Sequence, residues 1–194
     1  TTNASFFNDI FGVVRDDAQN LGVVSSTSNE TDSIVSVTAN SEGTNTAPVY
    51  ADMTDKEALF IGNDNALTTD WYDTGAAFED APSGYLVQAR TWKVQKTGDV
   101  GPVTLSFNID DVDFNINEIT GMDGNLYFVR DVANNGTFSD ETPVLMTNAG
   151  SGIWTVTLTD LVDGQEFTIA QQTPAAPGGV SVQIKFWVRA DKGV

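Results

Sequence analysis

The chain has 194 residues, with 27 acidic side chains, 9 basic ones and neither His nor Cys, so its formal net charge is −18. This acidity argues against a nucleic-acid partner, because the phosphate backbone is itself negative. The lack of His and Cys excludes disulfides, zinc fingers, thiol nucleophiles and a Ser–His–Asp triad. No run of 18 apolar residues occurs, so we expect no membrane insertion.

The apolar residues are of the kind that favours β-structure. The chain contains 21 Val and 9 Ile against 9 Leu, together with 23 Thr. β-branched side chains lose rotamer freedom in helices and fit the pleated surface of a sheet. In chain order, this composition and the local alternation predict strands at residues 21–25, 33–39, 58–62, 85–94, 103–109, 125–130, 154–158, 165–170 and 180–188.

Residues 103–109 show the alternation well, because Val103, Leu105 and Phe107 are separated by polar residues. Turn signals such as Asp163-Gly164 separate the expected strands. About nine short strands joined in this way predict an all-β fold, an antiparallel β-sandwich of the jelly-roll or Ig-like kind with long acidic loops. We expect little helix, at most a turn or two at residues 54–59, where Glu57 stands three residues after Thr54 as in a capping box.

The charge distribution and one Pro/Gly-rich stretch predict the domain organisation. Residues 99–141 carry nine acids and one base, whereas residues 165–194 carry two acids and three bases. The stretch 173–179 contains two Pro and two Gly and is typical of a linker. We therefore expect a β-sandwich domain at 1–172, a linker at 173–179 and a strand-like tail at 180–194. The tail is either an extra strand of this domain or the start of a following one.

A group of segments along the chain shares its pattern with a known kind of module: residues 8–17, 90–98, 134–140, Trp154 and 163–170, with 177–180 and 186–194 in the tail. The segments before the tail resemble a β-rich module of very large, adhesin-like, secreted bacterial surface proteins. That module accompanies concanavalin-like or laminin-G-like domains, and the tail is similar to the opening of such a lectin-like domain. The resemblance implies a secreted or cell-surface location and neighbouring domains of the same protein as partners, but it implies no catalytic chemistry.

The loop at residues 131–141 is the first candidate site, for calcium. Calcium takes six to eight oxygen ligands, which short loops supply at alternating positions around a glycine. With Asp131 at position one, Asn135 stands at position five and Thr137 at the backbone-carbonyl position, while Ala133 lacks a ligand oxygen. Asp140 or Glu141 would have to replace the usual final glutamate. The alternative is an Asx-rich turn, in which these side chains bind their own backbone.

A second acidic segment, residues 110–118, has Asp111 and Asp113 alternating with Val112 and Phe114. This pattern suits either a shared calcium ion or a half-buried strand with a solvated polar face. Among 27 acids, no spacing singles out a general acid and base, so we expect a protein that is not an enzyme and has no catalytic residues.

Trp71 and Tyr72 are the candidate ligand-binding residues. They stand in an expected loop rich in Asp, Gly and Ala, and aromatic side chains on loops bind sugar rings or peptides. The alternative is that they pack into a core or a domain joint. The sequence thus predicts a non-enzymatic extracellular module, a calcium-stabilised spacer or adhesive unit. The other hypothesis is a carbohydrate- or peptide-binding domain with its own pocket.

Overall fold

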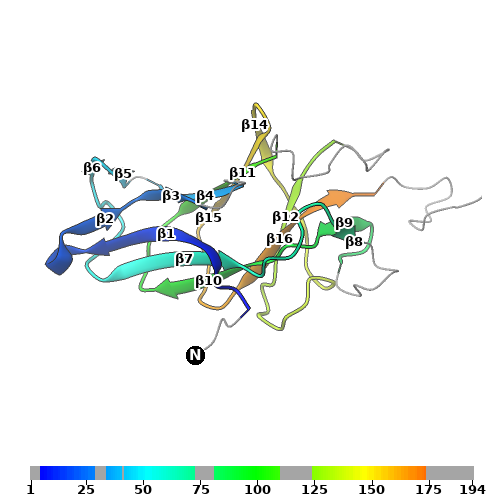
Figure 1. Ribbon diagram of the computed structural model, residues 1–194, viewed down its shortest axis with the longest axis horizontal. Coiled ribbons are helices and arrows are strands. Elements are labelled where there is room, and N and C mark those ends of the chain that lie inside the picture. Colours follow the sequence, from blue (N-terminus) through cyan, green and yellow to red (C-terminus); the bar gives the residue numbers. More distant parts are fainter. Residues whose placement is uncertain (1–4, 29–33, 41, 73–80, 110–123, 174–194) are drawn as a thin grey trace, which may run out of the picture.

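The structure is a computed structural model and describes residues 5–28, 34–40, 42–72, 81–109 and 124–173. Strands dominate this part of the chain, and its helical content is the short 3₁₀ turn η1 (Asp17–Gln19). Sixteen strands form two antiparallel sheets and the small hairpin β5 (Gly43–Thr44) and β6 (Ala47–Pro48). The two sheets face each other in a sandwich-like arrangement, which confirms the predicted all-β class (Figure 1).

The larger sheet runs in the order β13-β12-β16-β10-β7-β1-β2, with β9 also beside β16 and β8 beside β9. Strand β16, which pairs with β12, β10 and β9, is the last described strand of the chain. The bounds of the nine strands are β1 (Asn8–Asp16), β2 (Leu21–Val23), β7 (Glu57–Asn63), β8 (Trp71–Tyr72), β9 (Tyr85–Gln88), β10 (Trp92–Thr97), β12 (Tyr127–Arg130), β13 (Val144–Leu145) and β16 (Glu166–Gln172).

The smaller sheet runs in the order β14-β15-β11-β4-β3. The chain crosses from the larger sheet to this one at Val24, where the side-chain oxygen of Asn45 accepts hydrogen bonds from the amides of Val24 and Ser25. The bounds of the five strands are β3 (Ser25–Thr27), β4 (Val35–Ala39), β11 (Val103–Asn108), β14 (Thr147–Gly150) and β15 (Ile153–Leu158).

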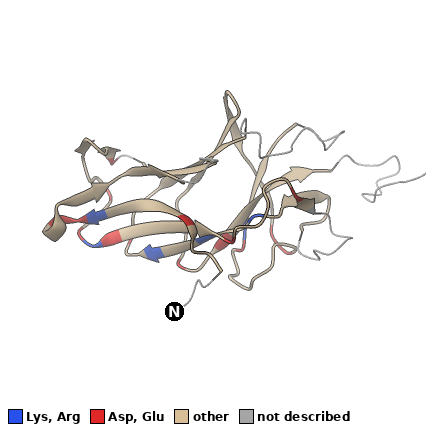
Figure 2. Ribbon diagram, viewed as in Figure 1, with Lys and Arg blue, Asp and Glu red and all other residues tan. Residues whose placement is uncertain are grey.

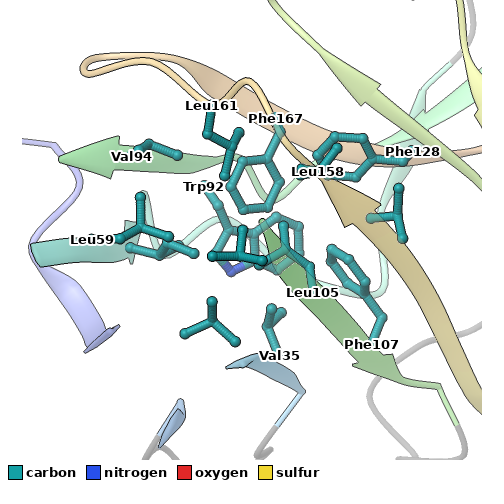
Figure 3. Packing of buried hydrophobic residues seen from close by; sticks show 14 of the residues in the cluster. Val35, Leu59, Trp92, Val94, Leu105, Phe107, Phe128, Leu158, Leu161 and Phe167 are labelled. Atoms are coloured by element: carbon teal, nitrogen blue, oxygen red, sulfur yellow. The ribbon is translucent and has the colours of Figure 1, made fainter. Parts of the chain in front are cut away.

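The main core fills the space between the two sheets (Figure 3). Trp92 on β10 stacks on Phe167 of β16, with ring centroids 5.8 Å apart, and meets the edge of Phe107 from β11 at 5.7 Å. Phe128 of β12 lies 5.2 Å from Phe167. Aromatic pairs in such geometries add to the stabilisation that burial alone provides, so these four rings join the two sheets.

A second, smaller core lies on the opposite face of β9, β12 and β16. In a strand, successive side chains point to opposite faces, so Val129 and Ala170 lie on the other side of the sheet from Phe128 and Ile169. They are buried with Val87, Ala81 and the loop residue Phe138. Tyr85 and Tyr127 pack against this cluster, edge to face at 5.1 Å. Strand β16 is therefore buried on both faces.

The alternation at residues 103–109 is confirmed, because Val103, Leu105 and Phe107 are buried and the residues between them are partly exposed. Two segments each form two strands instead of the one expected. Residues 21–25 divide between β2 and β3, and residues 85–94 divide between β9 and β10. At the second division, the hydroxyl of Thr168 contacts the carbonyls of Gln88 and Arg90 at 3.0 and 2.9 Å.

The helix expected at residues 54–59 is wrong. Lys56 has a φ of +69° and the segment leads into β7 at Glu57. The capping-box contact itself exists, since the Glu57 carboxylate accepts the amide of Thr54 at 2.6 Å. Its other oxygen accepts the amide of Asp99 at 2.9 Å, and residues 58–63 pair with β1 and β10. Sheet pairing therefore overrides the local helix signal.

The tail predicted at residues 180–194 lies outside the described residues, and β16 ends just before it at Gln172. In the described part, charged residues mostly lie near strand ends and in loops, while the strand interiors are largely uncharged (Figure 2). The described part holds no helix of the length and apolarity needed to cross a membrane.

Candidate functional site

Asp131 anchors the loop that the sequence singled out. It follows β12 directly and is buried, with 1% of its surface exposed. Its amide donates to the carbonyl of Glu166 at 2.9 Å, which attaches the start of the loop to β16. Its two carboxylate oxygens accept the amides of Asn135 at 3.0 Å and Gly136 at 2.7 Å. The loop thus closes around one buried carboxylate.

The other predicted residues of this loop join the same network. One oxygen of Glu141 accepts the amides of Val132 at 2.6 Å and Ala133 at 3.3 Å. The Asn135 side chain donates to Asp140 at 3.1 Å and accepts the amide of Thr137 at 3.0 Å. The structure therefore brings Asp131, Asn135, Thr137, Asp140 and Glu141 together. Their contacts are those of the Asx-rich turn that the sequence left as the alternative.

The loop also covers the second core. Phe138 stands in its middle and is buried against Val129 and Ala170 on the outer face of the larger sheet. Gly136 has a φ of +83°, a conformation that glycine adopts at little cost and that turns the chain at this point. The polar contacts of the loop thus serve to place one aromatic side chain over the sheet.

Calcium binding at this loop stays a prediction. A cation would have to share the oxygens of Asp131 with the two amides that they already accept. Across the described ranges, no three acidic side chains are gathered closely enough to hold a metal ion. The second candidate, with Asp111 and Asp113, lies outside the described residues.

Trp71 lies in the short strand β8, not in a loop as expected. It pairs with Gln88 of β9 and its indole is partly buried against the main core. Tyr72 follows it in the same strand and pairs with Val87. The strand arises because β9 offers a free edge next to residues 71 and 72, a long-range contact that local sequence does not report.

Two further carboxylates bind loop amides in the way that Asp131 does. Glu42 is fully buried, and one of its oxygens accepts the amides of Asp52 at 2.5 Å and Met53 at 3.2 Å. Glu57 bridges Thr54 and Asp99, as described above. Desolvation alone would raise the pKa of Glu57, but these amide donors outweigh it and hold the pKa below its usual value. The capping-box spacing pointed to Glu57, whereas no local signal marks Glu42.

An open polar groove of about 460 Å³ lies beside η1. Two of its carboxylates are paired with cations: Asp17 with Arg15 at 2.8 Å, and Asp16 with Lys56. Each cation lowers the pKa of its partner below the usual value. The guanidinium of Arg15 also lies 4.4 Å from the ring centre of Tyr50. The groove is lined by Asp16, Asp17, Asn20, Leu21, Gly22, Asn45, Pro48 and Tyr50.

Comparison with known proteins yields one family. The family described as a domain of unknown function, DUF8202, matches residues 1–165. This range includes every described strand except β16, which begins at Glu166. No curated protein and no solved structure matches the chain.

Proposed function

The chain belongs to the DUF8202 family, and we propose that it is a non-enzymatic structural module, a spacer or adhesive unit of a larger extracellular protein. The resemblance of its segments to modules of bacterial surface proteins supports this role. So does the absence of His and Cys, since the most frequent general acid–base residue and the thiol nucleophile are both missing.

The observation that carries the proposal is the use of carboxylates to bind main-chain amides of loops. Asp131, Glu42 and Glu57 each accept two main-chain amides, and each pair of amides lies in a loop or links two loops. Hydrogen bonds to charged groups stabilise by about 1.5–3 kcal/mol each. A catalytic carboxylate must be able to exchange protons with a substrate, whereas these side chains fix loop geometry. A module that transmits load or holds neighbouring domains apart needs such fixed loops.

Location on intact cells tests this proposal. An antibody raised against the isolated chain is added to cells that produce the protein, before and after permeabilisation. Staining of intact cells is the expected result, and its loss after mild surface proteolysis would strengthen it. Staining that requires permeabilisation would contradict the extracellular role. A cytoplasmic protein labelled in the same samples serves as the control for cell integrity.

Calcium is the proposed stabilising ion of this module, at the loop of residues 131–141. Because these carboxylates are not gathered closely enough in the described structure, calcium would have to draw the exposed carboxylate of Asp140 and the free oxygen of Glu141 toward Asp131. Extracellular modules bind calcium with dissociation constants of about 10⁻⁴–10⁻³ M. Binding of this strength would hold the loop in one geometry outside the cell, where calcium is abundant.

A further inference from the structure

Strand β2 forms one edge of the larger sheet, and its residue Gly22 lines the polar groove beside η1. In the β1–β2 ladder, Gly22 stands opposite Arg15. The carbonyl of Arg15 accepts the amide of Lys56 at 2.9 Å, so it points away from β2 and toward the segment that enters β7. In an antiparallel ladder, hydrogen-bonded and non-hydrogen-bonded residue pairs alternate, and Arg15 and Gly22 are a pair of the second kind. The main-chain N–H and C=O of Gly22 therefore point away from β1, out of the edge of the sheet.

The next residues along this edge show how such main-chain groups can be bound. The side-chain oxygen of Asn45 accepts the amide of Val24 at 2.8 Å and that of Ser25 at 3.0 Å. The side-chain nitrogen of Asn45 donates to the carbonyl of Ser25 at 2.7 Å. Asn45 thus takes the place that a peptide group of an added strand would take. Among the described residues, no side chain does the same for Gly22.

The groove gives a ligand room beside this free edge. It is open to solvent and measures about 460 Å³, within the range of about 300–1,000 Å³ that is common for ligand pockets. Asn45 and Pro48, from the hairpin β5–β6, line it opposite β2, and the hairpin lies beside β2 at one end of the molecule (Figure 1). A Cβ at residue 22 would lie 1.5 Å from the hydroxyl oxygen of Tyr50, so only glycine lets this ring lie against the strand.

Charge determines which kind of segment fits this groove. Its lining includes the carboxylates of Asp16 and Asp17 and no cationic residue. The Asp17 side chain is 52% exposed although Arg15 binds it, and its main-chain amide donates to Asp55 at 2.7 Å. Three carboxylates thus stand near two cations, Arg15 and Lys56, in a chain of net charge −18. A carboxylate has about four acceptor sites, so a Lys or Arg side chain in the groove would find acceptors and a favourable field.

We propose that this groove binds a short, extended peptide segment of another protein that carries Lys or Arg, and that the segment adds to β2 as a further strand. The main chain of the segment pairs with the N–H and C=O of Gly22, and its basic side chains bind Asp16 and Asp17. In strand addition, main-chain hydrogen bonds provide affinity and alternate side chains provide specificity. The site goes beyond the structural role proposed above and does not depend on it.

The test is a titration of a fluorescent peptide of alternating Val and Lys with the whole chain, followed by anisotropy. Saturable binding is expected. A peptide with Glu in place of Lys, and a Val-Lys peptide methylated on its central main-chain nitrogens, should bind at least about tenfold more weakly. Asp17→Asn should weaken binding of the Val-Lys peptide severalfold. Asp160→Asn is the matched control and should leave it unchanged, because Arg130 binds Asp160 through two hydrogen bonds as Arg15 binds Asp17.

Amide hydrogen exchange in the unmodified chain separates strand addition from a general attraction of basic peptides to an acidic protein. With saturating Val-Lys peptide, the amide of Gly22 should exchange at least about tenfold more slowly. The amide of Gly136, which Asp131 already accepts, should not change. Binding that leaves the exchange of Gly22 unchanged would overturn the proposal, and so would equal binding of the Lys and Glu peptides or no saturable binding of the Val-Lys peptide. None of these results bears on the structural role, which cell-surface staining tests separately.

Discussion

The two cores of this protein are built in different ways. The main core lies between two sheets, and most of its residues come from strands, some of which alternate apolar and polar side chains, as β4 and β11 do. The second core lies under the loop of residues 131–141, and its central residue, Phe138, belongs to no strand. Apolar burial between strands dominates the first, whereas the second lies under a loop whose amides are bound by Asp131 and Glu141. The difference shows that carboxylates can act as structural parts of a β-sandwich.

Removing a ring from the main core should have the largest effect. Trp92→Ala would delete the ring that joins Phe167 to Phe107 and would leave a cavity between the sheets. A loss of about 3–5 kcal/mol in the free energy of unfolding is expected, measured by urea denaturation. Phe60→Ala, at an exposed position of β7, is the control and should cost under about 1 kcal/mol. Equal costs for the two variants would contradict the assigned core.

Phe138→Ala tests the second core. The covering loop can relax into the space left by the ring, so the expected cost is about 2–3 kcal/mol, below that of Trp92→Ala. The exposed neighbour Val132 provides the control Val132→Ala, which should change stability little. Proteolysis within residues 131–141 should become faster in Phe138→Ala only. A cost as large as that of Trp92→Ala would show that the two cores form one cooperative unit.

The next prediction concerns acid, because carboxylate contacts distinguish the loops from the main core. Amide donors hold the pKa of Glu57 below its usual value, as Lys96 does for Asp99. A carboxyl group whose pKa is lower in the folded state stabilises it above its unfolded pKa, about 3.9 for Asp and 4.3 for Glu, and loses this effect as the pH falls further. The unfolding free energy should therefore decrease from pH 5 to pH 3.

Glu57→Gln should flatten this decrease, since it removes one of the groups that titrate. The substitution should also lower the free energy of unfolding at pH 7. The Glu57 carboxylate uses both oxygens to accept the main-chain amides of Thr54 and Asp99, whereas a Gln side chain has only one acceptor oxygen. Urea denaturation at each pH measures both effects. If the unfolding free energy rose steadily down to pH 3, relief of the −18 charge would outweigh the carboxylate contacts.

Calcium should have the smallest effect. With a dissociation constant of about 10⁻⁴–10⁻³ M, calcium at about 2 mM stabilises by roughly 0.6–1.8 kcal/mol. Melting in calcium and in excess chelator measures this difference, and Asp131→Asn should reduce it. If Asp113→Ala reduces it instead, the site lies in residues 110–118. Identical melting curves in both conditions would contradict the calcium prediction.

The sequence predicted the main core far better than the loops and the edges. Alternation at Val103, Leu105 and Phe107 reports burial directly, because one face of β11 meets the other sheet. The sequence did not predict strand β1, because Val13 and Val14 are adjacent apolar residues and interrupt the alternation that marks a half-buried strand. Of these two residues, only Val13 is buried in the core. Trp71 was expected in a loop because its pairing with β9 is a contact between distant residues.

In the candidate site too, the contacts that the sequence predicted are those between residues close together in the chain. The spacing of Asp131, Asn135 and Gly136 predicted a closed loop, because each contact spans only a few residues. Glu42 binds amides ten and eleven residues away, and Trp71 meets Gln88 through strand pairing. Such partners are set by the tertiary fold, so a single sequence gives no local sign of them.

The position of β16 has a consequence for how the chain reaches this fold. The last described strand pairs with β10, β12 and β9, and its Phe167 stacks on Trp92, which precedes it by 75 residues. The larger sheet therefore stays in three parts, β13-β12, β8-β9 and β10-β7-β1-β2, until residues 166–172 have left the ribosome. Contacts between residues so distant in sequence make folding slow. A chain exported from its N-terminus would cross a membrane before its sandwich closes, and would complete the fold on the far side.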